Sequence, residues 1–302
     1  MSLQLRPATP AEQRARDALT WAEWGSRLTV AQYLEREQAL RSHPWPREAM
    51  TTWLLTEGRQ ILCSCETFRN ESSVGGHPGS SFAVASVFTE PDRRGKGYAG
   101  KMMSALLERL RERPDAQSSV LFSDVGAPLY EKAGYRALPA WDWVLPAADV
   151  PSDAQGLGRP VSAPPRGAGV EGQLLLHPSG QQLDWHFERS ELYARFFGRP
   201  PLSDYGARTA LGTAWWTAQF KSDELLVLWL DAPDAAAAAP LLRAAQLQAH
   251  RAGLPRVRVW ETFRLDAIAG AQRRVREGEL PMVVALNVPF SSWQRVERAL
   301  WV

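Results

Sequence analysis

The chain has 302 residues, of which 45% are hydrophobic and 23% charged, and 35 Lys and Arg against 33 Asp and Glu give it a net charge of +2. This composition fits two modest globular domains or one large one, and the small basic excess argues against a dedicated nucleic-acid-binding protein. The N-terminus has no apolar signal core, and no run approaches the roughly 18–20 apolar residues of a membrane span. We therefore expect a soluble, cytoplasmic protein that binds neither nucleic acid nor a membrane.

The first half predicts strands and helices in close succession. Apolar spacing and turn residues indicate, in chain order, a strand at 3–9, helices at 9–24 and 29–43, strands at 50–57, 60–69 and 81–90, a helix at 99–113, a strand at 118–124, a short helix at 127–134 and one or more strands within 135–146. The polar, glycine-containing stretch at 70–81 favours a loop between two of these strands. The helix at 99–113 is amphipathic, with its methionines and leucines on one side.

The second half repeats this kind of order after a change in composition. Pro, Gly, Ala and Ser dominate residues 147–172, which indicates a linker. The elements expected after it are a helix at 184–197, strands at 214–220 and 223–231, an Ala-rich helix at 233–253 and a strand at 256–263. The tetrapeptide ETFR occurs in both halves, but so short a match often arises by chance. We predict an α/β fold with domains at 1–146 and 173–302.

Metal chemistry has little support in the sequence. Cys63 and Cys65 are the only cysteines and have no second pair to complete a zinc site, so we expect two core residues. The five histidines show no paired spacing. Most of the tryptophans are expected in the core or at interfaces, including four that fall in predicted strands of the second half, Trp215, Trp216, Trp229 and Trp260.

A glycine-rich, basic turn lies between the strand at 81–90 and the helix at 99–113. A turn of this kind presents backbone N–H groups together with the positive end of the helix dipole, which suits an anion and most often a phosphate. The P-loop pattern is not met, because Met102 follows Lys101. The spacing of Gly95, Gly97 and Gly100 superficially matches a dinucleotide fingerprint, but that fingerprint belongs after the first strand and this turn follows several.

Two motifs together resemble the GNAT superfamily of N-acetyltransferases. Arg94, Gly97 and Ala99 match the R-x-x-G-x-A acetyl-CoA pyrophosphate loop. About thirty residues later, Tyr130 lies four residues before Gly134 in SDVGAPLYEKAGY, as in the second half of that fold. A narrower resemblance, strong over residues 53–136, is to the fungal lysine N6-acetyltransferase family, and LLRAAQLQAHRAGLPRVRVWE is similar to the C-terminal extension of that family.

The resemblance implies a GNAT fold, with a mixed, splayed central sheet and flanking helices, in residues 1–146. It implies acetyl-CoA as cosubstrate and direct acetyl transfer to a primary amine of a small molecule, and free lysine is the first candidate for this acceptor. A protein amine, an aminoglycoside, or a non-catalytic acetyl-CoA sensor or scaffold are the alternatives. One interpretation of the C-terminal α/β domain is a degenerate GNAT-like copy. It lacks the loop motif, so we expect that it does not bind CoA. It would form one wall of the substrate site or a homodimer interface.

Catalytic roles follow from the same resemblance. Tyr130 is the candidate general acid for the thiolate leaving group, and the alternative is a core aromatic. Glu66 is the candidate base, on the expectation that burial raises its pKa. The alternatives for Glu66 are a structural carboxylate or one that holds a cationic substrate. Asp124 and Glu261 compete with it, although Asp124 could also cap the following helix.

The predicted cofactor contacts form an edge and a loop. Pantetheine would bond to the open edge of the strand before the loop, with Ser123 on the far side of the cleft, although the edge could equally be an ordinary paired strand. The residues assigned to the edge are Ser86, Val87, Phe88 and Thr89, and those assigned to the loop are Arg93, Arg94, Gly95, Lys96, Gly97, Tyr98, Ala99 and Gly100. Arg93 and Lys96 could instead be solvated charges.

Overall fold

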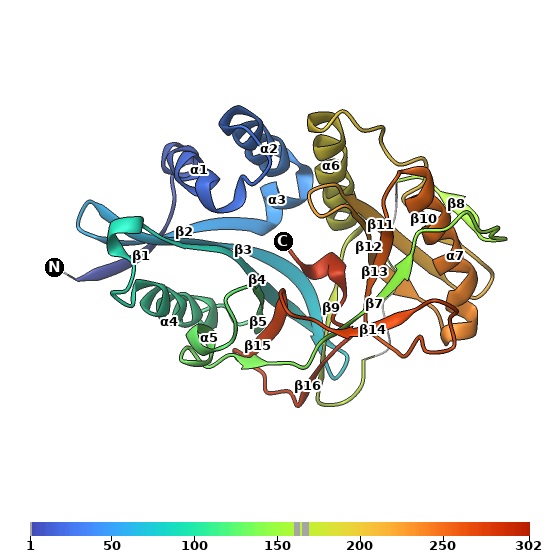
Figure 1. Ribbon diagram of the computed structural model, residues 1–302. Helices are drawn as coiled ribbons and strands as arrows, with labels where there is room; N and C mark the ends of the chain where they lie inside the picture. The colour runs from blue at the N-terminus through green and yellow to red at the C-terminus, as the bar shows by residue number, and fades with distance from the viewer. Residues whose placement is uncertain (1, 160–163, 165–168) are drawn as a thin grey trace.

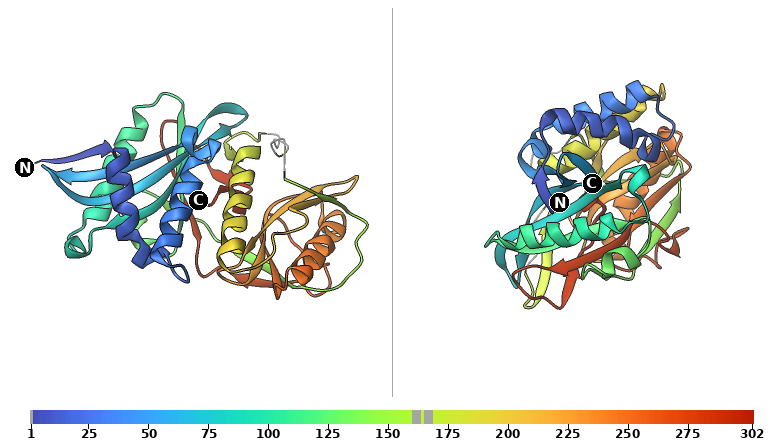
Figure 2. Two further views of the ribbon diagram at one scale, coloured as in Figure 1. Left: turned by 90° about the horizontal axis from the view of Figure 1, so that it is seen from above. Right: turned by 90° about the vertical axis from the view of Figure 1, so that its left-hand side faces the viewer.

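Two β-sheets lie side by side along the long axis of the protein (Figures 1 and 2), whose computed structural model describes residues 2–159, 164 and 169–302. Within the described residues the first sheet has nine strands, ordered β1-β2-β3-β4-β5-β15-β6 with β9 paired to β3 and β16 to β9, and the second has seven, ordered β14-β7-β13-β12-β11-β10-β8. No helix in this part of the chain is long and apolar enough to cross a membrane.

The elements have the following bounds. The helices are α1 (Pro10–Trp24), α2 (Val30–Ser42), α3 (Pro44–Ala49), α4 (Tyr98–Arg111), α5 (Pro128–Glu131), α6 (Gly180–Phe196) and α7 (Ala235–Arg251), with 3-10 turns at Pro91–Arg93 and Arg298–Leu300. The strands are β1 (Leu3–Pro7), β2 (Met50–Glu57), β3 (Gln60–Val74), β4 (His77–Thr89), β5 (Ala116–Ser123), β6 (Arg136–Ala137), β7 (Trp141–Pro146), β8 (Gln155–Leu157), β9 (Gln173–His177), β10 (Gly206–Arg208), β11 (Thr213–Gln219), β12 (Glu224–Asp231), β13 (Arg256–Trp260), β14 (Gln272–Val275), β15 (Leu280–Ala285) and β16 (Ser292–Gln294).

Helices cover both faces of the first sheet. Figure 1 shows α1, α2 and α3 on one side and α4 and α5 on the other. Helices α1 and α2 each begin with a capping box, in which Thr9 and Thr29 exchange hydrogen bonds with Glu12 and Gln32. Helix α4 buries its apolar side against the sheet, as its sequence pattern predicts.

The loop expected at 70–81 is instead the end of a long hairpin. Strands β3 and β4 pair as far as Val74 and His77, and the turn consists only of Gly75 and Gly76. Both glycines have positive φ, 58° and 84°, which side-chain-bearing residues rarely adopt. The serines that indicate a loop by composition are hydrogen-bonded inside the sheet: Ser81 donates to Ser72 at 2.8 Å and accepts from Ser118 of β5 at 2.7 Å. Tertiary hydrogen bonding therefore overrides local polarity.

The sheets exchange strands across the predicted domain boundaries. Strand β7, which ends at residue 146, lies in the second sheet, whereas β9, β15 and β16 from the second half lie in the first. The linker region 147–172 contains β8 of the second sheet, and residues 160–163 and 165–168 of that region lie outside the described residues. The division at residues 146 and 172 therefore remains a prediction, and the sheets do not follow it strand by strand.

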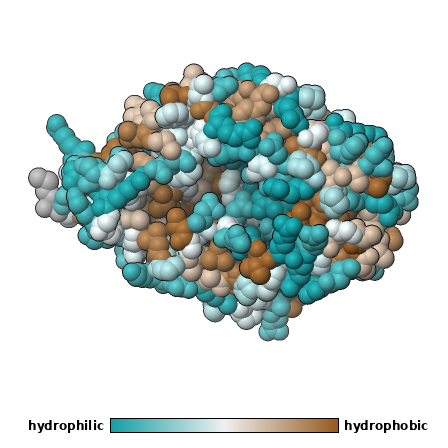
Figure 3. Space-filling view, in the orientation of Figure 1, coloured by the Kyte–Doolittle hydropathy of each residue, from teal (hydrophilic) through white to brown (hydrophobic). Residues whose placement is uncertain are grey.

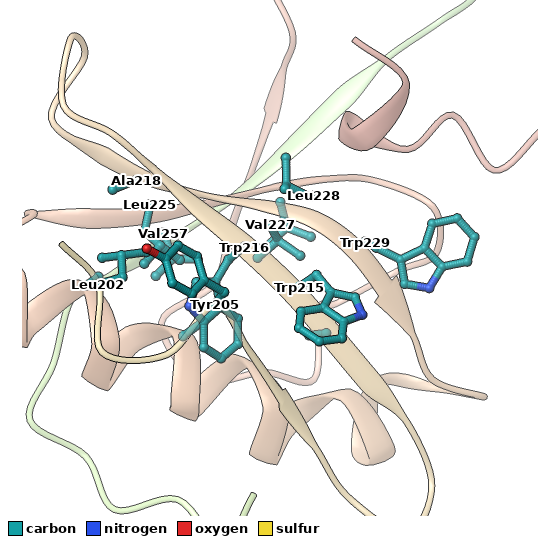
Figure 4. Packing of buried hydrophobic residues seen from close by; sticks show 14 of the residues in the cluster. Leu202, Tyr205, Trp215, Trp216, Ala218, Leu225, Val227, Leu228, Trp229 and Val257 are labelled. Carbon is teal, nitrogen blue, oxygen red and sulfur yellow. The ribbon is translucent and has the colours of Figure 1, made fainter. Parts of the chain in front are cut away.

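A parallel strand–helix–strand crossover recurs in both sheets. Helix α4 connects the parallel strands β4 and β5, and α7 connects the parallel strands β12 and β13. In the second sheet the strands carry a tryptophan-rich core (Figure 4), in which Trp215, Trp216 and Trp229 are each less than 9% exposed. With Trp260 at 2% exposure, the expectation of core tryptophans is confirmed.

Candidate functional site

Strands β4 and β5 separate at the centre of the first sheet. Their parallel pairing ends at Val84 and Leu121, and beyond this point β5 continues only with β15. The registration of β4 with β3 shifts between Ser64 and Glu66, and Ser86 opposite this shift has a φ of 54°. This bulge turns the edge at 85–89 away from β5, which confirms the splay that the sequence led us to expect.

Arg16 from α1 fixes this bulge. Its Nη2 donates to the Ser86 carbonyl oxygen at 2.8 Å, its Nε donates to Ser64 Oγ at 2.7 Å, and its Nη1 lies 3.2 Å from Glu66 Oε1. The guanidinium therefore satisfies backbone and side-chain groups of both β3 and β4 where their ladder is irregular. No motif in the sequence points to Arg16, because a single arginine on a polar helix carries no spacing signal.

The glycine loop follows β4 directly and leaves an open helix terminus. Gly97 is the N-cap of α4 without a side-chain cap, and the first backbone bond of the helix runs from Lys101 N to Gly97 O, at 3.1 Å. The amides of residues 98–100 therefore precede the intrahelical ladder. Gly95 and Gly97 both have a φ of 76°, and a Cβ on Gly95, Gly97 or Gly100 would meet no atom within 4 Å. The space above the loop is open.

The loop cations fold back onto neighbouring groups. Arg94 pairs with Glu23 of α1 and donates to the Thr89 carbonyl at 3.3 Å. Arg93 pairs with Asp92 at 3.0 Å, and Lys96 Nζ donates to the Asp92 carbonyl oxygen at 3.0 Å. These contacts are exposed, so they are weak and an anion at the loop can compete for the cations.

Tyr130 lies in α5 beside the splayed strands. The residue is 8% exposed, and its ring packs edge-on against Tyr135 at 6.1 Å. Its hydroxyl makes no hydrogen bond to another described residue. Burial raises the pKa of Tyr130 to about 12, with smaller contributions from Cys65 and Asp124. The hydroxyl therefore carries its proton at neutral pH and has no competing partner in the described chain.

Ser123, Asp124 and Glu261 have different surroundings from those expected. Ser123 Oγ donates to the Gly126 carbonyl at 2.7 Å, within the turn that leads to α5. Asp124 does not cap that helix, because its Oδ1 accepts from the Glu279 amide at 2.9 Å, and its side chain lines the main cavity. Glu261 binds Arg273 through both carboxylate oxygens at 2.6 Å and is not among the residues that line the cavity.

Glu66 does not have the raised pKa that its sequence setting suggests. Burial raises the pKa, but Arg16 and Arg41 together lower it by more, so that the net pKa of Glu66 lies below its ordinary value. Arg41 Nη2 lies 3.0 Å from Glu66 Oε1. Two arginines from different helices therefore hold an ionised carboxylate in the sheet, which makes Glu66 a poor proton acceptor.

A cavity of about 1100 Å³ lies between the two halves and includes this region. Figure 3 shows a hollow near the middle of one face, with hydrophilic surface beside it. The cations that line the cavity are Arg16, Arg36, Arg41, Arg189, Lys221, Arg256, Arg258, Arg274 and Arg276, and the carboxylates are Glu37, Glu66, Asp124, Asp142, Glu224, Glu277 and Glu279. The cavity is therefore not acidic. Most of these side chains come from elements far apart in the chain, so sequence spacing could not group them.

The described residues contain no cluster of three or more His, Cys, Asp or Glu side chains that could hold a metal ion. Cys63 and Cys65 are free and fully buried against α4, as expected of core residues. Burial raises the pKa of both thiols, so neither is an activated nucleophile.

Replacing Glu66 should destabilise the protein in a pH-dependent way. At about pH 7, Glu66→Gln removes a negative counter-ion from two buried arginines, and we expect a loss of about 3–5 kcal/mol in the free energy of unfolding. The pKa of Glu66 is depressed in the folded state, so its contribution is present above the unfolded value of about 4.3 and disappears as pH falls through the folded value. Urea unfolding should therefore show the difference from the native chain shrinking below about pH 4.

A matched control is Glu23→Gln, which removes a carboxylate from an exposed pair with Arg94. We expect a loss below about 1 kcal/mol for this variant. Similar losses for the two variants at neutral pH would contradict the buried role of Glu66.

Comparisons with known proteins agree with this geometry. Residues 23–138 match the acetyltransferase (GNAT) domain family, and residues 152–284 match the LYC1 GNAT-like C-terminal domain family. A protein of Yarrowia lipolytica named lysine acetyltransferase is 28% identical over 147 residues, which cover 46% of this chain and 37% of that protein.

Solved structures show the same two-part fold at low identity. A probable N-acyltransferase from Enterococcus faecalis has a TM-score of 0.60 and 13% identity, covering 95% of this chain and 73% of its own. A GCN5-related N-acetyltransferase from Kribbella flavida has a TM-score of 0.58 and 16% identity, covering 95% and 72%. Residues 23–138 are therefore a GNAT acetyltransferase domain, and they are followed over 152–284 by a GNAT-like C-terminal domain of the LYC1 type.

Proposed function

We propose that the protein is an acetyl-CoA-dependent N-acetyltransferase that moves the acetyl group directly to a primary amine of a small molecule, such as free lysine. The observation that carries this proposal is the joining of the splayed β4 edge to an open glycine loop at the start of α4. The edge offers backbone groups to a pantetheine arm, and the loop offers amides to a pyrophosphate. The similarity to a Yarrowia lysine acetyltransferase supports the choice of acceptor.

Acetyl transfer needs a neutral amine, a stabilised oxyanion and a protonated leaving group. Tyr130 supplies the proton to the thiolate, since its pKa of about 12 keeps it protonated and its hydroxyl is uncommitted among the described residues. Asp124 accepts the ammonium proton, directly or through water, because it is an exposed carboxylate on the cavity wall. Glu66 holds Arg16 and thereby positions the bulge at Ser86.

The cavity also bears on the choice of acceptor. An aminoglycoside is a polycation and would favour a carboxylate-rich groove, whereas nine cationic and seven acidic side chains line this cavity. A small acceptor with negative charge of its own suits this balance better.

Gly100 tests the cofactor loop without disturbing the fold. Its φ is ordinary and a Cβ there would meet no protein atom within 4 Å, so the fold does not require a glycine. We expect Gly100→Ala to raise stability by up to about 1 kcal/mol and to weaken CoA binding about tenfold, because the methyl group occupies space needed by the pyrophosphate. Calorimetric titration with CoA and thermal melting measure the two effects. Gly158→Ala is the matched control at another unobstructed glycine, and equal CoA affinity in both variants would contradict the site.

Removing the Tyr130 hydroxyl should slow the chemical step. With L-lysine as acceptor, Tyr130→Phe should lower kcat for free-thiol release from acetyl-CoA by about a hundredfold or more, with CoA affinity unchanged. Lysine-dependent release at the native rate would remove Tyr130 as the acid. Tight CoA binding without release to lysine or any amine of a wider panel would favour a non-catalytic acetyl-CoA sensor.

The variant Asp124→Asn distinguishes a role of Asp124 as proton acceptor from its structural hydrogen bond to the Glu279 amide. Asparagine keeps an oxygen that accepts from the Glu279 amide but cannot take a proton. We expect kcat to fall about a hundredfold while the melting temperature and CoA affinity stay unchanged. Glu261→Gln, a carboxylate paired with Arg273 away from the cavity, should leave kcat within about twofold. Native kcat in Asp124→Asn would exclude Asp124 as the base.

A further inference from the structure

Among the described residues, three cations on the cavity wall have no carboxylate partner, and two of them, Arg189 and Lys221, are half-buried, whereas Arg274 is exposed to solvent. Neither Arg189 of α6 nor Lys221, in the turn between β11 and β12, lies within ion-pair distance of a carboxylate among the described residues. Several other lining arginines are paired: Arg258 lies 3.1 Å from Glu224, for example. Unpaired charge in a partly enclosed site is costly unless a ligand compensates it.

The contacts of these two side chains leave their charge uncompensated. The Arg189 guanidinium lies over the Trp301 ring, 4.5 Å from its centroid. Lys221 Nζ reaches only the Trp24 carbonyl oxygen, at 3.5 Å. Both side chains are half-buried on the cavity wall.

The pKa of Tyr193 indicates a positive electrostatic potential next to Arg189. Its hydroxyl accepts from Arg36 Nη1 at 2.6 Å, and Arg36 is itself paired with Glu37. Burial raises the pKa of Tyr193, but Arg189 and Arg36 lower it by more, and the net pKa is below its ordinary value. The surroundings therefore favour a negative charge.

Trp24 connects Lys221 to the splayed edge. Trp24, whose carbonyl oxygen accepts from Lys221, packs its ring edge-on against Phe88 of β4, with 6.1 Å between centroids. Burial lowers the pKa of Lys221, and Tyr193 and, to a smaller extent, the Asp124 carboxylate oppose that effect. The cations and the proposed proton acceptor therefore share one cavity.

Resting on the proposed function, we propose that Arg189 and Lys221 form a subsite that binds the carboxylate of the acceptor, so that the acceptor is an amino acid and not a diamine. A guanidinium matches a planar carboxylate, and an ammonium adds a second charge-assisted hydrogen bond. The subsite would anchor the acid end of the substrate while its free amine faces Asp124 and the thioester.

Acceptor pairs that differ only in the carboxylate test this subsite. We would measure thiol release with L-lysine against cadaverine and with L-ornithine against putrescine. The native chain should show a kcat/KM at least about tenfold higher for the amino acid of a pair. Arg189→Gln and Lys221→Met should each raise KM for the amino acid about tenfold, with kcat and the KM for the diamine within about twofold. Arg274→Gln, the same charge change at an exposed lining position, should leave the preference intact.

Binding measurements separate this inference from the proposed function. Calorimetry on the CoA-bound protein compares Nε-acetyl-L-lysine with N-acetylcadaverine, after thermal melting has shown that each variant folds. A preference for the carboxylate-bearing molecule that is lost in both variants, without turnover of any amine, would support the subsite and overturn the acetyltransferase proposal. Turnover with equal kcat/KM and equal binding within each pair would overturn the subsite and leave the acetyltransferase proposal standing.

Discussion

The Arg16 guanidinium is the contact on which the rest of the site depends. It connects α1 to β3 and β4 at the point where their registration shifts, and it bonds to the carbonyl of Ser86, a residue with a φ of 54°. Without a bulge at this position β4 would continue beside β5, and no open edge would exist. Glu66 keeps Arg16 in place, and Arg41 completes the charge balance from α2. A buried ion network therefore serves backbone geometry here, at a desolvation cost that its hydrogen bonds offset.

The two crossovers differ in the N-cap residue of their helix, and this residue decides whether the helix N-terminus can bind an anion. In the first sheet, Gly97 is the N-cap of α4 and leaves the first amides of the helix open. In the second, Asp234 is the N-cap of α7, and its Oδ1 accepts from the Ala237 amide at 2.9 Å. A carboxylate at the helix terminus satisfies the amides and repels an anion. This contrast supports the expectation that the second half does not bind CoA, and it follows from side-chain chemistry on similar backbone arrangements.

Strand exchange explains why the cavity is shared between the halves. Strand β15 reaches from the second half to extend the first sheet beside β5, and β7 does the reverse. The connection before β15 brings Glu279 to Asp124, where the backbone amide of one holds the carboxylate of the other. The wall of the cavity is therefore built from both sheets, which is consistent with the prediction that the second half walls the substrate site.

Much of this protein could be predicted from the sequence because the signals are local. Hydrophobic periodicity predicts α4, β5 and the central strands β11, β12 and β13 of the second sheet, and the glycine loop with Tyr130 indicates the GNAT fold. The serines of the β3–β4 hairpin mislead because polar side chains indicate a loop unless partners from another strand satisfy them. Glu66 misleads because its pKa depends on arginines 50 and 25 residues away.

The sequence by itself determined the glycine loop, the helix after it and the order of the longer elements in the first half, since turn chemistry and amphipathic spacing act over a few residues. Only the tertiary structure decided which sheet each strand joins, which carboxylate faces the cavity and which cations lack a partner. Those outcomes depend on pairing between distant segments, such as Asp124 with Glu279 and Lys221 with Trp24. Long-range electrostatics and strand registration have no counterpart in a local pattern, because the groups involved meet only after folding.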